Sequence, residues 1–241
     1  MPTPFLTAEW RSLAMLNYEI DPAALAPFVP AGTELDQWQG KTYVSMVGFM
    51  FLNTRVMGIS IPFHANFEEV NLRFYVRRQA PDGTRRGVVF IKELVPRAAI
   101  AWTARTFYNE NYVALPMNHR WRTFDSGGIE ATYSWSFGGR ENRLRVLTSG
   151  EPAEALSGSC EEFITEHYWG YARQRDGGTV EYQVEYPRWR VWRAGEATFD
   201  CDVAGLYGRQ FADILAPPPA SAFLADGSPV TVFKGTRLAL E

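Results

Sequence analysis

The sequence predicts a mainly β protein (β-rich α+β), in which one antiparallel or mixed sheet forms a barrel-like domain or a sandwich and a few helices pack against it. Segments with the period-two alternation of strands outnumber segments with helix signals. The predicted helices lie between groups of strands and do not follow each strand, which favours an antiparallel or mixed sheet. There is no internal repeat, low-complexity tract or shift in composition, so we expect one domain over residues 1–241.

The first part of the chain is expected to form strands around one short helix. Residues 10–18 mix strand and helix signals, and we assign them to a strand. Asp21 and Pro22 are typical of a helix start, and this helix ends before Pro30. The elements expected next are a short strand at 35–38, a strand apolar on both faces at 43–52, and a loop at 53–64 that could act as a lid.

The stretch from residue 66 to residue 117 carries most of the convergent polar groups. Polar and apolar residues alternate from Glu69 to Arg77, which is the period of a strand with one polar and one apolar face. Pro81, Asp82 and Gly83 favour a tight turn, and an apolar strand follows around residues 88–91. Both the alternation and the turn residues therefore predict a β-hairpin.

A helix is predicted directly after this hairpin. Pro96 suits the first position of a helix, and residues 97–109 follow without a breaker. Arg105 shares one face of that helix with Ala101 and Tyr108, at the i, i+3/i+4 spacing. The helix must pack back on the hairpin to bury its apolar residues, and Arg105 and Tyr108 are candidate ligand-binding residues.

The second half of the chain continues the strand-rich pattern. A helix is expected at 159–169, with two glutamates in its first turn, and another at 207–215, before three consecutive prolines. The predicted strands lie at 121–124, 129–137, 143–147, 180–186, 188–192, 197–201 and 230–240.

The composition argues against several classes of partner. A net charge of −3 gives no reason to expect nucleic acid or an anionic membrane as a partner. No segment approaches the roughly 20 apolar residues of a membrane span, and no signal peptide is evident. Cys160 and Cys201 are isolated and are expected to be free thiols in a reducing compartment. We therefore expect a soluble cytoplasmic protein, and the sequence leaves open whether it forms a homo-oligomer.

Familiar motifs for metals, nucleotides and nucleophiles are absent from the sequence. His64, His119 and His167 share no metal-ligand spacing, so no metal is predicted. There is no glycine-rich nucleotide motif and no nucleophile elbow around a serine, so no cofactor is predicted.

Four charged residues are the candidates for chemistry. Glu69, Arg73 and Arg105 form a cluster if they lie inside a closed sheet, where arginine recognises a carboxylate through its planar fork of donors. Alternatively, they belong to a solvated strand face and a helix surface. Lys92 lies in a predicted strand and, in an apolar pocket, could act as an amine nucleophile; otherwise it is a strand-end charge that reaches water. Glu93 is expected on the opposite face.

Several segments together carry a resemblance to a known family. They are FEEVNLRFYV, GVVFIKELVPR, ARTFYNENY, FITEHYWGY, YPRWRVW and APPPASAFLADGSPVTVF. This succession, which covers residues 10–233, resembles the YqjF-like family, known as domain of unknown function 2071. The family is similar to the acetoacetate decarboxylase fold, and the resemblance implies a β-barrel with an interior pocket.

The resemblance also assigns roles to individual residues. Glu68-Glu69-Val70 stands where the decarboxylase has its pocket-glutamate strand, so Glu69 would be that pocket residue. Ala104-Arg105 matches a Gly-Arg segment of the decarboxylase. Leu115-Pro116-Met117-Asn118 stands where that enzyme has the lysine that forms a Schiff base. Because that lysine is absent, decarboxylation by the same route is not expected.

Three hypotheses for the function remain. In the first, the protein is an enzyme that acts on a small keto acid or other carboxylate, with Glu69 as acid or base and Lys92 as its only plausible amine. In the second, the same pocket binds or senses a small ligand without turnover. In the third, the barrel is filled and the protein is structural or oligomerising.

Overall fold

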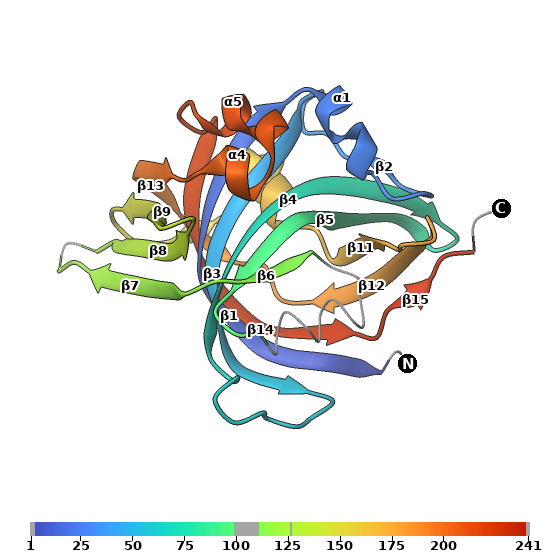
Figure 1. Ribbon diagram of the computed structural model, residues 1–241, viewed down its shortest axis with the longest axis horizontal. Helices are drawn as coiled ribbons and strands as arrows, with labels where there is room; N and C mark the ends of the chain where they lie inside the picture. The colour runs from blue at the N-terminus through green and yellow to red at the C-terminus, as the bar shows by residue number, and fades with distance from the viewer. Residues whose placement is uncertain (1–2, 99–110, 126, 240–241) are drawn as a thin grey trace.

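The computed structural model describes residues 3–98, 111–125 and 127–239 and confirms a mainly β fold with few helices (Figure 1). All the strands described belong to one 15-stranded sheet. The predicted helix at 97–109, with Arg105 and Tyr108, falls almost wholly outside the described residues. Among those described, no helix is both long and apolar enough to cross a membrane.

Seven strands of this sheet form a closed ring. Their order is β12-β11-β5-β4-β3-β1-β14, and β12 pairs again with β14 through Val184 and Val232, which closes the ring. Neighbouring strands are antiparallel except β11 and β5. The ring strands are β1 (Pro4–Ile20), β3 (Thr42–Val56), β4 (Phe67–Ala80), β5 (Gly83–Val95), β11 (Trp169–Arg173), β12 (Thr179–Glu185) and β14 (Ser221–Phe233).

A second group of strands extends from the ring at β14 and lies at the left of Figure 1. These strands are β13 (Arg190–Asp200), β9 (Arg140–Thr148), β8 (Ile129–Phe137) and β7 (Met117–Thr123). The short strands β2 (Glu34–Leu35), β6 (Tyr112–Ala114), β10 (Ala153–Glu154) and β15 (Thr236–Arg237) pair with β4, β5, β13 and β12. Because β14 is long, one half of it closes the ring and the other half carries this extension.

The helices are short. The helix predicted after Asp21 is present as α1 (Pro22–Leu25), continued by η1 (Ala26–Phe28), and the Asp21 carboxylate accepts a hydrogen bond from the Ala23 amide at 2.8 Å. The helix predicted at 207–215 is instead α4 (Val203–Leu206), η2 (Arg209–Phe211) and α5 (Ala212–Leu215), with Gly208 at positive φ between them. A left-handed residue ends one helix and starts another.

Two predicted boundaries are wrong for a shared reason, which is that strand pairing overrides local signals. The helix predicted at 159–169 ends at Thr165 (α3, Cys160–Thr165), because Trp169 and the residues after it pair with β12 and β5. The last strand was expected to start at residue 230, but β14 begins at Ser221 and runs through Gly227 and Pro229. These residues are rare in strands, yet the pairing with β1 is long enough to hold them.

Both faces of β4 are buried, and this decides where the protein can hold a ligand. Val70, Leu72 and Phe74 belong to the core cluster outside the ring, between the ring, the extension and the C-terminal helices. Tyr75, on the other face, belongs to the second cluster, inside the ring. The polar face of β4 therefore points into the ring and away from solvent.

Phe74 offers a test of the core packing of β4. Its side chain is fully buried, so we expect Phe74→Ala to lower the free energy of unfolding by about 3–5 kcal/mol in urea denaturation. Phe63→Ala is the matched control, because Phe63 is 88% exposed and should change stability by less than about 0.5 kcal/mol. Equal effects of the two variants would contradict the burial of Phe74 in the core cluster outside the ring.

Candidate functional site

The ring encloses a cavity of about 230 Å³ to which all seven of its strands contribute side chains. The walls are mainly aromatic and aliphatic, which is the composition of sites that bind small organic molecules. The polar side chains in the lining include those of Thr54, His64, Glu69, Asn71, Arg73, Glu93, Tyr112, His167, Tyr182 and Tyr186. The interior is therefore hollow, and β4 contributes more of these polar side chains than any other strand.

The central polar groups come from one row on β4. Glu69, Asn71 and Arg73 alternate with apolar residues, so they share a face, and that face lines the cavity. They are 2%, 1% and 8% exposed, respectively. Of the two interpretations open from the sequence, the structure therefore brings Glu69 and Arg73 together in the interior and not on a solvated face.

Glu69 is held by two hydrogen bonds. Its Oε1 accepts from the Asn71 amide at 3.0 Å, and its Oε2 accepts from the Tyr112 hydroxyl at 3.2 Å. Burial raises the pKa of Glu69 to about 7, although these two hydrogen bonds and the nearby charge of Arg73 favour the carboxylate. Near neutral pH this carboxyl group can therefore either give or take a proton.

Arg73 lies two residues further along the same wall. Its Nη2 donates to the carbonyl of Ile164 at 3.4 Å, and its guanidinium carbon lies 5.6 Å from the centre of the Tyr75 ring. Its Nε is buried and has no hydrogen-bond partner among the described residues. A buried guanidinium with an unused donor is suited to binding an anion.

A β-bulge in β5 decides which charged residue faces the cavity. Leu72 pairs with Lys92 but Arg73 pairs with Phe90, so Ile91 is an extra residue in β5. The bulge shifts the alternation of inward and outward side chains by one residue, so that Glu93, which follows the bulge, lines the cavity. Lys92 is not in the lining: its amine donates to the carbonyl of Leu206, outside the ring, and burial lowers its pKa. The structure does not bring Lys92 together with Glu69.

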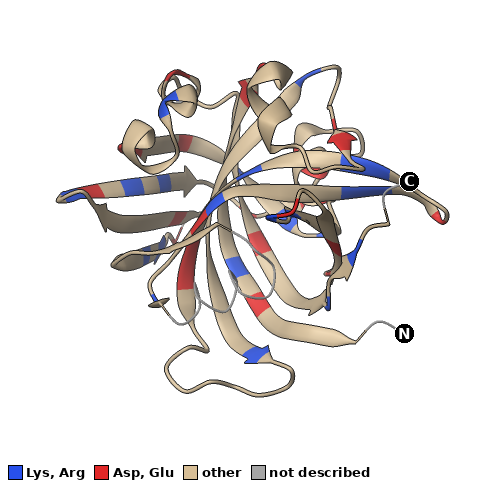
Figure 2. Cartoon of the chain, turned by 45° about the vertical axis from the view of Figure 1, so that its right-hand side comes forward, with Lys and Arg blue, Asp and Glu red and all other residues tan. Residues whose placement is uncertain are grey.

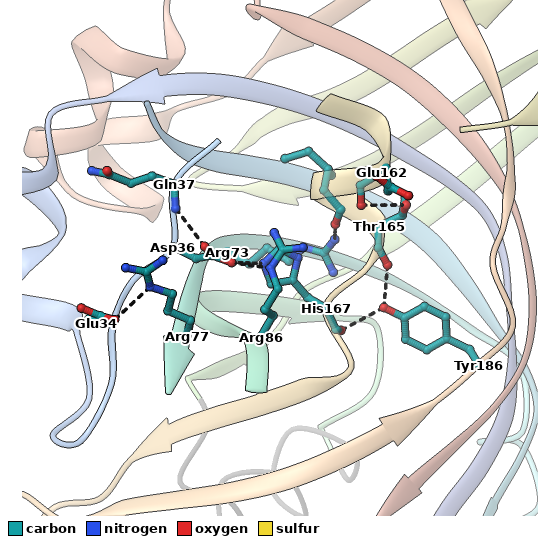
Figure 3. A network of polar contacts seen from close by, with 11 residues as sticks. Glu34, Asp36, Gln37, Arg73, Arg77, Arg86, Glu162, Thr165, His167 and Tyr186 are labelled. Atoms are coloured by element: carbon teal, nitrogen blue, oxygen red, sulfur yellow. Dashed lines mark hydrogen bonds and ion pairs between the residues drawn. The ribbon is translucent and has the colours of Figure 1, made fainter. Parts of the chain in front are cut away.

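A third polar element reaches the cavity from the segment between α3 and β11. His167 is 4% exposed, lines the cavity, and lies 3.2 Å through Nε2 from Oδ2 of Asp36 (Figure 3). Asp36 follows β2 and also accepts a hydrogen bond from Nε of Arg86 at 2.7 Å. Burial lowers the pKa of His167 to about 4, although the hydrogen bond that the ring donates to Asp36 favours the protonated ring.

Arg86 belongs to a group of four arginines at the end of the β4–β5 hairpin, where Figure 2 shows basic and acidic residues near each other. Each of these arginines lies within 3.4 Å of a carboxylate. The pairs are Arg77–Glu34, Arg78–Glu181, Arg85–Asp82 and Arg86–Asp36. The hairpin end is thus balanced in charge, and Asp36, unlike the other three carboxylates, also bonds a histidine.

The sequence did not indicate all of these residues. His167 has no metal-ligand spacing to the other histidines, and its partner Asp36 lies 131 residues away, so no local pattern joins them. Glu93 does lie on the face opposite to Lys92, as predicted. Only the bulge, however, shows which of these two side chains points into the cavity. In the described part of the chain, no group of three potential ligands is arranged for a metal ion. The segment at 115–118 contributes no described side chain to the lining.

Solved structures with the same fold come from acetoacetate decarboxylase and related enzymes. The acetoacetate decarboxylase of Legionella pneumophila subsp. pneumophila str. Philadelphia 1 is 12% identical, with a TM-score of 0.67 over 98% of this chain and 87% of that chain. The enduracididine biosynthesis enzyme MppR, solved in complex with pyruvate, is 14% identical, with a TM-score of 0.69 over 99% of this chain and 91% of that chain. These likenesses confirm the acetoacetate-decarboxylase-like fold.

Relatives in sequence identify the family. Uncharacterized protein YqjF of Bacillus subtilis (strain 168) is 30% identical over 109 residues, so the match spans 45% of this chain and 43% of that relative, less than half of either. The model of the family described as Uncharacterized conserved protein (COG2071), DUF2071, matches residues 7–229, which is most of the chain. The chain therefore belongs to the DUF2071 family, as the resemblance predicted.

Proposed function

We propose that the cavity binds a small carboxylic acid, such as a keto acid, and that Glu69 is the acid–base group that acts on it. The observation that carries this proposal is the buried pair of Glu69 and Arg73 on one wall of an apolar cavity. The guanidinium of Arg73 offers donors that match a carboxylate, and low solvent screening strengthens their attraction. The aromatic and aliphatic walls suit the carbon chain of the acid.

The chemistry that fits Glu69 is the transfer of a proton at the carbon next to a carbonyl group. The carboxylate takes the proton, the C–H electron pair forms the C=C bond of an enolate, and return of the proton reverses the step. A general base works best with a pKa near the working pH, and the pKa of Glu69 is about 7. Asn71 and Tyr112 fix the carboxyl group in position through their hydrogen bonds.

The fold relatives support the substrate class but not their own route. MppR, which has this fold, was solved in complex with pyruvate, a small keto acid. A Schiff base is not part of the proposal, because the segment at 115–118 contains no lysine and Lys92 is absent from the described lining. Arg105 and Tyr108, which share a face of the predicted helix, remain candidate ligand contacts outside the described residues, and the resemblance also indicates Arg105.

A second candidate is a binding or sensing protein without turnover. The absence of any lysine from the described lining favours it, since a binding site needs no amine nucleophile. The hypothesis of a filled, purely structural interior is disfavoured by the cavity of about 230 Å³.

Solvent exchange tests the enzyme against the binding protein. In deuterium oxide, we expect the protein to accelerate exchange at C3 of 2-oxopentanoate, measured by proton NMR, and Glu69→Gln to reduce this rate by about 100-fold or more, because an amide cannot accept the proton. Binding without exchange would instead favour the sensing role. An adduct trapped on any lysine by borohydride would replace this route by a Schiff base.

Arg73 provides the test of carboxylate binding. We expect Arg73→Met to weaken binding of 2-oxopentanoate about tenfold or more in calorimetry, since the charged hydrogen bonds to the carboxylate are lost. Arg77→Met is the matched control on the same strand, because Arg77 is half exposed and paired with Glu34 at the surface. Unchanged affinity in Arg73→Met, with the fold intact by circular dichroism, would exclude Arg73 as the anion site.

The pH dependence of stability contains two opposing contributions. The pKa of Glu69 is raised from 4.5 to about 7, so the folded state keeps a proton that the unfolded state has lost, and stability falls as the pH rises through this interval. The pKa of His167 is lowered from 6.5 to about 4, so the unfolded state binds the extra proton and stability rises with pH between these values. Between pH 4.5 and 6.5 the two slopes partly cancel.

Single substitutions should separate these slopes. In Glu69→Gln only the contribution of His167 remains, so we expect its free energy of unfolding to rise with pH over this interval. In His167→Gln only the contribution of Glu69 remains, so its free energy of unfolding should fall. Each change should be on the order of 3 kcal/mol. Urea denaturation at intervals from about pH 4 to about pH 8 measures both profiles. If both variants keep the profile of the unsubstituted protein, the two groups do not titrate as their burial requires.

A further inference from the structure

The two ring nitrogens of His167 have different surroundings. Nε2 lies 3.2 Å from Oδ2 of Asp36, whereas Nδ1 is buried and has no hydrogen-bond partner among the described residues. The ring lines the cavity from a position that the chemistry proposed for Glu69 does not use. An unpartnered ring nitrogen in a cavity wall is unusual, because buried polar atoms in folded proteins are nearly always bonded.

The partner of Nε2 fixes where the ring carries its hydrogen. Burial by itself would raise the pKa of Asp36, but the hydrogen bonds from His167 and Arg86 outweigh it and bring the pKa to about 2. At neutral pH Asp36 is therefore a carboxylate that can only accept, so Nε2 must carry the hydrogen. The ring is neutral above about pH 4, which leaves a lone pair on Nδ1.

The orientation of the ring is fixed as well. It packs at 4.7 Å against the ring of Tyr75 and edge-on at 5.1 Å against Phe163, and the Tyr186 hydroxyl donates to its main-chain carbonyl at 2.9 Å. The charged groups around it are Asp36, Arg86 and Arg73. With the ring held on both sides, Nδ1 cannot turn to a protein donor elsewhere.

The groups next to His167 complement it. Arg73 lies beside the same Tyr75 ring, with its guanidinium carbon 5.6 Å from the ring centre, and its positive charge acts on His167. Both side chains line the cavity, so an acid held by Arg73 shares that space with the His167 ring. Asn71 donates to Glu69, which leaves its buried Oδ1 as a second acceptor without a partner. The wall thus offers a buried donor, Nε of Arg73, and two acceptors that lack donors.

We propose that the acid bound in this cavity carries a hydroxyl group close to its carboxylate, and that Nδ1 of His167 accepts the hydrogen bond of this hydroxyl. This inference rests on the proposed binding of a small carboxylic acid at Arg73. Asp36 acts as a positioning residue, because its carboxylate keeps the hydrogen on Nε2 and the lone pair on Nδ1. A plain keto acid has no donor for this acceptor, so keto acids that also carry a hydroxyl group are the preferred class.

Calorimetry with a matched panel tests the preference. The probes are pentanoate, 2-oxopentanoate, 2-hydroxypentanoate and 3-hydroxypentanoate, which share one carbon chain. We expect one of the hydroxy acids to bind about tenfold more tightly than pentanoate and 2-oxopentanoate, and His167→Leu to abolish this difference while it still binds pentanoate. Equal affinity for all four acids would overturn the inference and leave the proposed function standing, whereas binding of none of them would overturn both.

Nitrogen NMR gives a second readout that does not depend on activity. The chain has three histidines, so ¹⁵N-histidine labelling gives few ring signals, and His64→Gln and His119→Gln assign those of His167. We expect Nδ1 of His167 to be unprotonated at neutral pH and to shift on adding the preferred hydroxy acid, and Asp36→Asn to populate the other tautomer. A hydrogen on Nδ1 in the unsubstituted protein, or no shift with the bound hydroxy acid, would overturn the assignment.

Discussion

The burial of the polar face of β4 inside a closed ring is the constraint from which the rest of the site follows. A strand in an open sheet can turn such a face to water, but the pairing of β12 with β14 removes that option. The side chains on this face must then find partners within the protein, as Glu69 does with Asn71 and Tyr112. Where the partners are incomplete, the wall is prepared for a ligand, because a buried polar atom without a hydrogen bond is unfavourable.

A single inserted residue in β5 then selects the chemistry. Without the bulge at Ile91, alternation from Phe90 would turn Lys92 toward the cavity and Glu93 away from it. With the bulge, a second carboxyl group enters the wall and the amine leaves it. The site therefore differs in kind from one built around an amine nucleophile, although the fold is that of acetoacetate decarboxylase. Fold and reaction are set by different features of the chain.

The hairpin at the centre of the fold was predictable because its signals are local: alternation along β4 and a Pro-Asp-Gly turn into β5. The direction of the polar face was not, since alternation shows that two faces differ but not which of them meets water. The bulge was equally invisible, because one extra residue leaves no mark in an apolar run such as Val88 to Ile91. The contact of Asp36 with His167 joins distant segments, and only the folded ring brings them together.

The electrostatics of the wall favour an anion because burial acts in opposite directions on its acid and its base. Desolvation keeps Glu69 protonated up to about pH 7 and keeps His167 unprotonated down to about pH 4, so both are neutral over the interval between. The buried guanidinium of Arg73 then lacks the full counter-charge that an ionised Glu69 would provide. A ligand carboxylate supplies it, and its negative charge in turn raises the pKa of Glu69 further, since two neighbouring anions repel. Binding of the acid and protonation of Glu69 therefore reinforce each other, so the carboxylate form of Glu69 that takes a proton from the substrate is reached at a higher pH in the complex than in the free protein.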